Sequence, residues 1–171
     1  MRQSKRRSKL RRLKKWWRRR SIQAINTYHP VKDWAINYLV DTGPLVAMLN
    51  KHDTLRDWSV NTLRSLSDTF YTTDAVITEV CYQLKNGRHA LPPLFEAIRV
   101  GQINVCPIFP EASERVNLMM QKYPQMDFAD ASLVALSEQY PRAKLITMDR
   151  RDFTIYCRAD GNLVPCIMPP V

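Results

Sequence analysis

Four carboxylates, Asp41, Glu79, Asp130 and Asp149, fall in or beside apolar segments at spacings of 38, 51 and 19 residues. If a fold gathers them into one cleft, they repel one another and each raises the pKa of the others. A divalent cation relieves that repulsion, and hard oxygen ligands without Cys or His favour Mg²⁺ or Mn²⁺ over Zn²⁺. Such a cation can bind a phosphate and activate a water. The set therefore predicts metal-dependent phosphodiester hydrolysis.

Each of these acids also has a structural alternative. Asp41 could satisfy backbone donors in a turn formed with Thr42 and Gly43. Glu79 lies on the boundary of the apolar face of its expected helix, where a solvated side chain would also fit. Asp149 could act as a direct ligand or through water. An acid directly after an apolar strand favours the functional interpretation for Asp41.

Three further residues are candidates for auxiliary roles: Thr42, Asp127 and Asp152. Thr42 could hydrogen-bond a metal-bound water or cap a helix. Asp127 is well placed as an N-cap, three residues before Asp130. Asp130 lies among apolar residues, and a buried acid needs a partner, so we interpret it as a ligand. Asp152 could assist the site or pair with a neighbouring arginine. The substrate-binding residues stay unassigned.

Strands and helices are expected to alternate along the chain after residue 36. The expected strands cover residues 38–40, 70–72, 103–107, 144–147 and 163–168. The expected helices cover residues 44–50, 55–66, 74–84, 92–100, 111–122 and 128–140. This alternation predicts an α/β fold with a doubly wound parallel sheet. Ligands of such sheets bind beyond the carboxyl ends of the strands, where these acids would meet.

The positive charge belongs to the start of the chain. Of 26 Lys and Arg residues, twelve lie within residues 1–20, which contain no acid, so the net charge of +10 is not spread over the fold. We expect residues 1–36 to be a basic extension, disordered or arising from a miscalled start, with a possible amphipathic helix around Leu10, Leu13 and Trp17. Residues 37–171 would form the domain.

Other features exclude several classes. The cysteines, Cys81, Cys106, Cys157 and Cys166, have no zinc-finger spacing, and we interpret them as reduced thiols of a cytoplasmic protein. The histidines, His29, His52 and His89, are interpreted as surface residues. No apolar run approaches the ~20 residues that cross a bilayer. No apolar segment follows the basic start, as a signal peptide requires.

Four segments resemble the motifs of PIN domains, particularly the VapC-like toxins. They are residues 38–45 (YLVDTGPL), 72–80 (TTDAVITEV), 126–135 (MDFADASLVA) and 145–153 (LITMDRRDF). The four segments follow one another in the same order as the motifs of the family, and the resemblance covers residues 37–168. It implies a three-layer α/β/α sandwich, with a parallel sheet of strand order 3-2-1-4-5.

The same resemblance implies an Mg²⁺- or Mn²⁺-dependent endoribonuclease. Its metal would be held chiefly by Asp41 and Asp130, with Glu79 and Asp149 completing the site directly or through water. It further implies a homodimer, and the toxin component of a VapBC-type toxin–antitoxin system with an antitoxin partner. The long basic extension departs from the usual pattern of the family, and the slightly acidic domain leaves the RNA-binding surface unassigned.

Two alternatives belong to other classes. One is a non-catalytic RNA-binding or interaction module that uses the basic extension. The other is a phosphatase of the haloacid-dehalogenase type, which also begins with a strand ending in Asp. That chemistry needs a second Asp two residues later, where this chain has Gly43.

Overall fold

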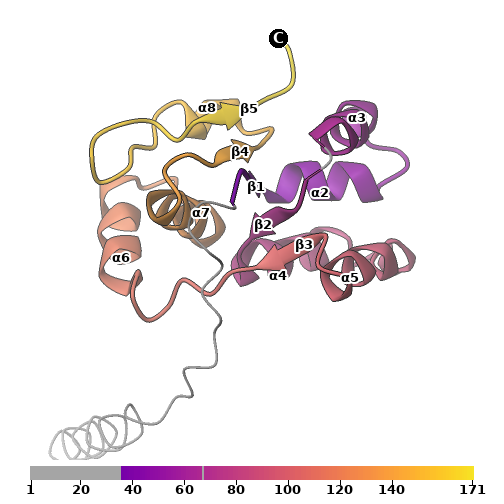
Figure 1. Ribbon diagram of the computed structural model, residues 1–171, viewed down its shortest axis with the longest axis horizontal. Helices are drawn as coiled ribbons and strands as arrows, with labels where there is room; N and C mark the ends of the chain where they lie inside the picture. The colour runs from indigo at the N-terminus through magenta and orange to yellow at the C-terminus, as the bar shows by residue number, and fades with distance from the viewer. Residues whose placement is uncertain (1–35, 67) are drawn as a thin grey trace, which may run out of the picture. The chain divides into compact units, whose positions relative to one another are not determined.

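The computed structural model describes residues 36–66 and 68–171, which include a five-stranded parallel sheet. The strand order is β3-β2-β1-β4-β5 (Figure 1). The strands are β1 (Tyr38–Val40), β2 (Phe70–Thr72), β3 (Ile103–Val105), β4 (Lys144–Ile146) and β5 (Cys166–Ile167). The predicted doubly wound α/β/α fold and its strand order are confirmed.

The first strand lies at the centre of the sheet. Leu39 pairs with Tyr71 of β2 on one side and with Leu145 of β4 on the other. Leu39 and Val40 are fully buried, as expected for the central strand of a parallel sheet with both faces covered. This position puts the residue after β1, Asp41, at the middle of the carboxyl edge.

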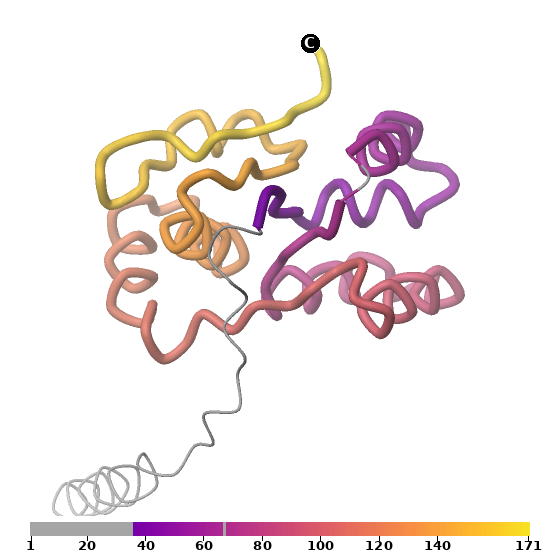
Figure 2. Tube along the Cα trace, in the orientation of Figure 1, coloured from indigo at the N-terminus to yellow at the C-terminus, as the bar shows by residue number. Residues whose placement is uncertain are grey.

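Helices cover both faces of this sheet. They are α2 (Thr42–Leu49), α3 (Arg56–Leu66), α4 (Asp74–Gln83), α5 (Pro92–Arg99), α6 (Ser113–Lys122), α7 (Phe128–Gln139) and α8 (Arg150–Phe153), with a short 3₁₀ turn, η1 (Arg88–Ala90). In Figure 1, α6 and α7 lie on one side of the strands, while α2 and α3 lie on the other. The tube in Figure 2 shows the alternation of strand and helix that builds these layers.

The apolar helix predicted from residue 128 is α7. Asp127 caps it, because its Oδ1 accepts a 2.8 Å hydrogen bond from the backbone N–H of Asp130. Residues 131–137 of this helix are all buried, and α7 packs against both α4 and α6. A helix this apolar belongs inside a domain, so the site acid Asp130 is attached to a rigid element.

Some predicted boundaries are wrong by a few residues. The helix expected from Pro44 begins at Thr42, because Asp41 caps it two residues earlier. Proline is tolerated there because the first helical turn does not use its missing N–H. The predicted strands 103–107, 144–147 and 163–168 are longer than the observed β3, β4 and β5. The single helical turn α8 is not predicted, since four residues are too few to show a helical period.

The expectations for residues 1–35 lie outside the described residues, and the boundary between residues 36 and 37 stays a prediction. Across the described ranges, no helix is both long and apolar enough to span a bilayer. The four cysteines are free thiols.

Candidate metal centre

Asp41 is a buried carboxylate with a hydrogen bond to each oxygen. Only 7% of the residue is exposed. Its Oδ1 accepts from the backbone N–H of Thr42 at 2.6 Å, and its Oδ2 accepts from the hydroxyl of Thr147 at 2.7 Å. The pKa of Asp41 is raised to about 6, chiefly by burial and to a smaller extent by the charges of Glu79 and Asp149, while the two hydrogen bonds lower it. The side chain is therefore fixed in place while its negative charge is only partly compensated.

Thr147 connects two of the predicted site acids. Its hydroxyl donates to Asp41 and accepts a 3.0 Å hydrogen bond from the backbone N–H of Asp149. Asp149 in turn caps α8, where its Oδ1 accepts from the N–H of Asp152 at 2.9 Å. The loop that follows β4 is thereby locked against the end of β1. This fixes Asp149 at the same edge of the sheet as Asp41.

Among the acids of this cluster, Asp130 has the pKa that departs furthest from its ordinary value. Burial raises its pKa to about 8, and the charges of Asp127, Asp41, Asp149 and Asp152 add to the effect. These contributions mean that carboxylates from three separate segments of the chain act on one another. At neutral pH, Asp130 therefore favours a proton or a cation at its carboxyl group.

Glu79 is held near Asp41 by a hydrogen bond from Thr42, which its position in the sequence did not indicate. Its Oε2 accepts a 2.8 Å hydrogen bond from the hydroxyl of Thr42, and its Oε1 accepts from the amide of Gln83 at 2.9 Å. The charge of Glu79 also acts on Asp41. Of the two roles considered for Thr42, that of helix cap is wrong, because Asp41 is the cap. Thr42 instead holds the carboxylate of Glu79 beside that of Asp41.

The remaining auxiliary acids differ in their surroundings. Asp127 is the cap of α7, as one of its two interpretations held, and its charge also acts on Asp130. Asp152 lies in α8 and acts on Asp130 as well. Its Oδ1 is buried and makes no hydrogen bond with the described residues. A buried carboxylate oxygen without a hydrogen-bond partner, in a residue whose charge acts on Asp130, is suited to a cation.

Tyr156 is a site residue that sequence reasoning missed. Its hydroxyl donates a 3.4 Å hydrogen bond to Oδ2 of Asp130. The ring is fully buried and packs against Tyr123 and Phe153, with ring centroids 5.2 and 5.5 Å apart. Burial and the neighbouring acids raise the pKa of Tyr156, which keeps its proton on the donor oxygen. Nothing in the sequence around residue 156 indicates this contact.

The four predicted acids thus lie near one edge of the sheet, where Thr42 and Thr147 link three of them and charge links Asp130 to Asp41 and Asp149. Among residues 36–66 and 68–171, no group of three or more Asp, Glu, His or Cys side chains is placed closely enough to hold a metal ion. The donor set still fits a hard cation, since it is made of carboxylates whose charges oppose one another. The buried, unpartnered oxygen of Asp152 supports the same fit. The metal-binding and catalytic roles of these residues stay predictions.

An acidic cluster beyond the carboxyl ends of a 3-2-1-4-5 parallel sheet defines a PIN-like α/β/α protein. A sequence model of the PIN domain matches residues 38–159, which is most of the chain. The chain therefore belongs to the PIN domain family. Members of this family are generally nucleases, and they generally depend on a divalent metal.

A solved structure with the same fold is the crystal structure of VapBC2 from Rickettsia felis bound to a DNA fragment from their promoter. The matching chain is 14% identical, with a TM-score of 0.58, over 79% of this chain and 100% of that one. At this identity the similarity establishes the fold. A comparison with curated proteins found no match.

Proposed function

We propose that this chain is a metal-dependent endoribonuclease that hydrolyses RNA phosphodiester bonds with Mg²⁺ or Mn²⁺. The observation that supports it best is the effect of burial and of neighbouring carboxylates on Asp41 and Asp130, whose pKa values rise to about 6 and about 8. Strongly perturbed carboxylates in one place are characteristic of functional sites. Membership of the PIN family supports nuclease chemistry.

In this proposal Asp41 and Asp130 hold the cation, with Glu79 and Asp149 contributing directly or through water. When bound, the cation polarises the scissile phosphate and lowers the pKa of an attacking water. The hydrogen bonds from Thr42 and Thr147 keep Asp41 in one orientation, so that the site needs little rearrangement when it is loaded.

We further propose that the chain is the toxin component of a VapBC-type toxin–antitoxin pair and acts as a homodimer in the cytoplasm. The similarity in fold to the VapBC2 structure supports an antitoxin as partner. Free thiols suit a reducing compartment. Expression of the wild-type chain should arrest growth, and expression of Asp41→Asn should not. Growth arrest by both chains would contradict a toxin that acts through cleavage.

The test of the nuclease is cleavage of a labelled RNA pool by the purified full chain in Mg²⁺, Mn²⁺ or EDTA. Cleavage should require the metal and should be lost in Asp41→Asn. Asp57→Asn is the matched control, because Asp57 is an exposed acid on α3. If the Asp41→Asn variant is folded by circular dichroism and still cleaves RNA as fast as the wild type, the assignment of the site is wrong.

The basic extension favours a second candidate, a non-catalytic RNA-binding module. Twelve cationic side chains within residues 1–20 would neutralise phosphates regardless of RNA sequence. Deleting residues 1–35 separates the two candidates. A binding module loses its affinity for RNA after the deletion, whereas a nuclease retains metal-dependent cleavage.

A further inference from the structure

Two large aromatic rings are stacked and exposed on the surface of the domain. Phe109 lies between β3 and α6, and Phe128 is the first residue of α7. Their ring centroids are 5.5 Å apart and their planes differ by only 9°. The two residues are 43% and 44% exposed, so a substantial part of each ring faces solvent. Rings that are exposed together in this way indicate a binding surface.

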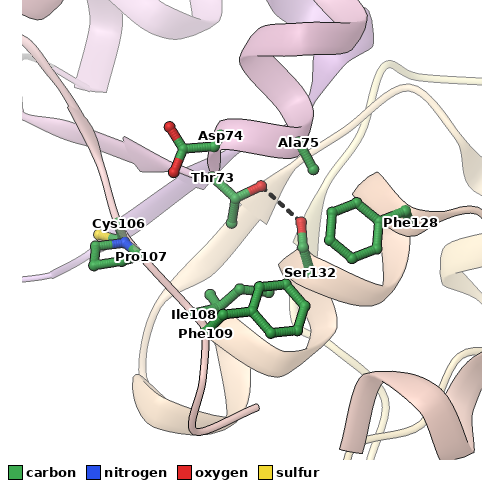
Figure 3. A pocket seen from close by; sticks show the side chains of 9 residues that line it. All are labelled: Thr73, Asp74, Ala75, Cys106, Pro107, Ile108, Phe109, Phe128 and Ser132. Atoms are coloured by element: carbon green, nitrogen blue, oxygen red, sulfur yellow. Dashed lines mark hydrogen bonds between the residues drawn. The ribbon is translucent and has the colours of Figure 1, made fainter. Parts of the chain in front are cut away.

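The rings border a hollow of about 240 Å³, which we call the aromatic pocket (Figure 3). It is lined by Thr73, Asp74, Ala75, Cys106, Pro107, Ile108, Phe109, Phe128 and Ser132. Thr73 and Ser132 are both buried and are hydrogen-bonded to each other at 2.6 Å. This bond joins the start of α4 to α7 and makes the lining rigid.

The charge of the lining selects the chemistry of the occupant. Among the described residues that line the pocket, Asp74 is the one charged side chain, and no Lys, Arg or His is present. A phosphate group would be repelled by this carboxylate and would find no cation. A flat, uncharged ring with a polar edge is better matched, since it can stack on the apolar rings.

The aromatic pocket lies at the same edge of the sheet as the acids. Thr73 directly follows β2 and Cys106 directly follows β3, as Asp41 directly follows β1. All three strands are parallel, so their carboxyl ends point the same way. Phe128 is also adjacent in sequence to Asp127 and two residues from Asp130. A strand of nucleic acid with a phosphate at the acids can therefore continue along this edge toward the pocket.

We propose that the aromatic pocket is a nucleobase-binding subsite, in which one unpaired base of a single-stranded RNA substrate stacks on the Phe109–Phe128 pair. This inference rests on the proposed ribonuclease function and specifies how its substrate is held. A paired base presents no free face to these rings. The subsite therefore selects single-stranded RNA and fixes the register of the strand relative to the acids.

Photo-crosslinking tests this proposal directly. The probe is a single-stranded RNA of about 12 nucleotides carrying 5-iodouridine at one position, moved along the strand in a series. The protein is the full-length Asp41→Asn chain, so that the probe stays intact. Crosslinked peptides are identified by mass spectrometry. We expect adducts on Phe109 or Phe128 for one or two adjacent probe positions, and not for the others.

Matched variants separate stacking from binding elsewhere on the chain. Phe109→Leu combined with Phe128→Leu retains apolar volume but removes both rings, and should weaken binding of the unmodified single-stranded RNA about tenfold. Phe95→Leu is the control, because Phe95 is a 50% exposed ring on α5 that does not line the pocket. Thermal unfolding of each variant establishes that the fold is retained.

The possible results have distinct meanings. Adducts confined to residues 1–35 would overturn the subsite. Binding of the single-stranded RNA that is unchanged when both rings are replaced would overturn it as well. A double variant that becomes monomeric, measured by sedimentation, would assign the rings to an interface between copies and also overturn it. If the double variant cleaves RNA at the same sites and the same rate as the wild-type chain, the subsite is rejected but the proposed nuclease function is not. Absence of any metal-dependent cleavage rejects the nuclease itself.

Discussion

The hydroxyl of Thr147 donates a 2.7 Å hydrogen bond to Oδ2 of Asp41, although the two residues are 106 positions apart. The same hydroxyl accepts the N–H of Asp149. One small side chain therefore sets both the ionisation of the central acid and the position of a second acid. Its replacement should affect chemistry more than folding.

Thr147→Val should move the pH dependence of RNA cleavage toward higher pH. The hydrogen bond from Thr147 lowers the pKa of Asp41, so its loss lets the pKa rise above about 6. Near pH 6 the variant should cleave about tenfold more slowly, and the deficit should shrink as the pH rises and Asp41 ionises. The measurement is a pH–rate profile at one fixed metal concentration below saturation, where the proton on Asp41 competes with the cation.

Thr154→Val is the control for that experiment, because the hydroxyl of Thr154 on the protein surface donates only to the carbonyls of Arg150 and Arg151. Its profile should match that of the wild type. A uniform loss of rate in Thr147→Val at every pH would contradict an effect through Asp41.

Asp130→Asn should stabilise the metal-free protein at alkaline pH. The pKa of Asp130 is about 8 in the fold against an ordinary value of 3.8, so the folded state binds its proton more tightly than the unfolded state. The stability that this proton contributes is complete below about pH 4 and is lost as the pH rises through 8. In EDTA at about pH 9 the variant should gain about 1–3 kcal/mol in free energy of unfolding over the wild type, with partial exposure of the carboxyl taken into account.

Urea denaturation at about pH 5 and pH 9 measures this difference. The exposed Asp57→Asn should show no such dependence on pH. If Asp130→Asn were equally less stable at both values, Asp130 would be a structural acid with a compensating partner rather than one held ready for a cation.

Tyr156→Phe should weaken the binding of Mg²⁺ while leaving the fold intact. The ring contacts with Tyr123 and Phe153 remain, so stability should change by no more than about 1 kcal/mol. The lost hydroxyl leaves Oδ2 of Asp130 without its donor. Groups that orient a metal ligand typically change affinity by about tenfold or more.

The readout is the Mg²⁺ concentration that produces half of the metal-induced rise in Tm, measured at constant pH. Tyr38→Phe is a suitable comparison, because Tyr38 lies on β1 with its ring near Phe70. An unchanged half-point in Tyr156→Phe would show that the hydroxyl serves packing alone.

The sequence predicted the architecture and the acids because both depend on local patterns. Apolar runs that alternate with amphipathic segments indicate a parallel sheet, and an acid directly after such a run falls at its carboxyl edge. Asp41 follows this rule directly, and Asp149 lies three residues after the end of β4. Asp130 was found because an acid within an apolar helix is unusual, and α7 proved to be buried.

The contacts that hold these acids could not be predicted in the same way. Tyr156 meets Asp130 only because the segment after α8 folds back over α7, and no local pattern encodes that path. Thr147 did leave a signal, since a hydroxyl at the end of an apolar strand faces the same edge as the acids. Thr42 was weighed as a helix cap, but Asp41 occupies that position, and the hydroxyl is directed to Glu79 instead.

The central place of β1 also bears on the order in which the site comes into being during synthesis. Asp41 leaves the ribosome early, but its partner Thr147 follows 106 residues later. A nascent chain that ends before β4 carries Asp41, Glu79 and Asp130 but lacks the strand that pairs with β1 and positions Thr147 against Asp41. If the proposed function holds, we expect cleavage to begin only when synthesis of the chain is nearly complete.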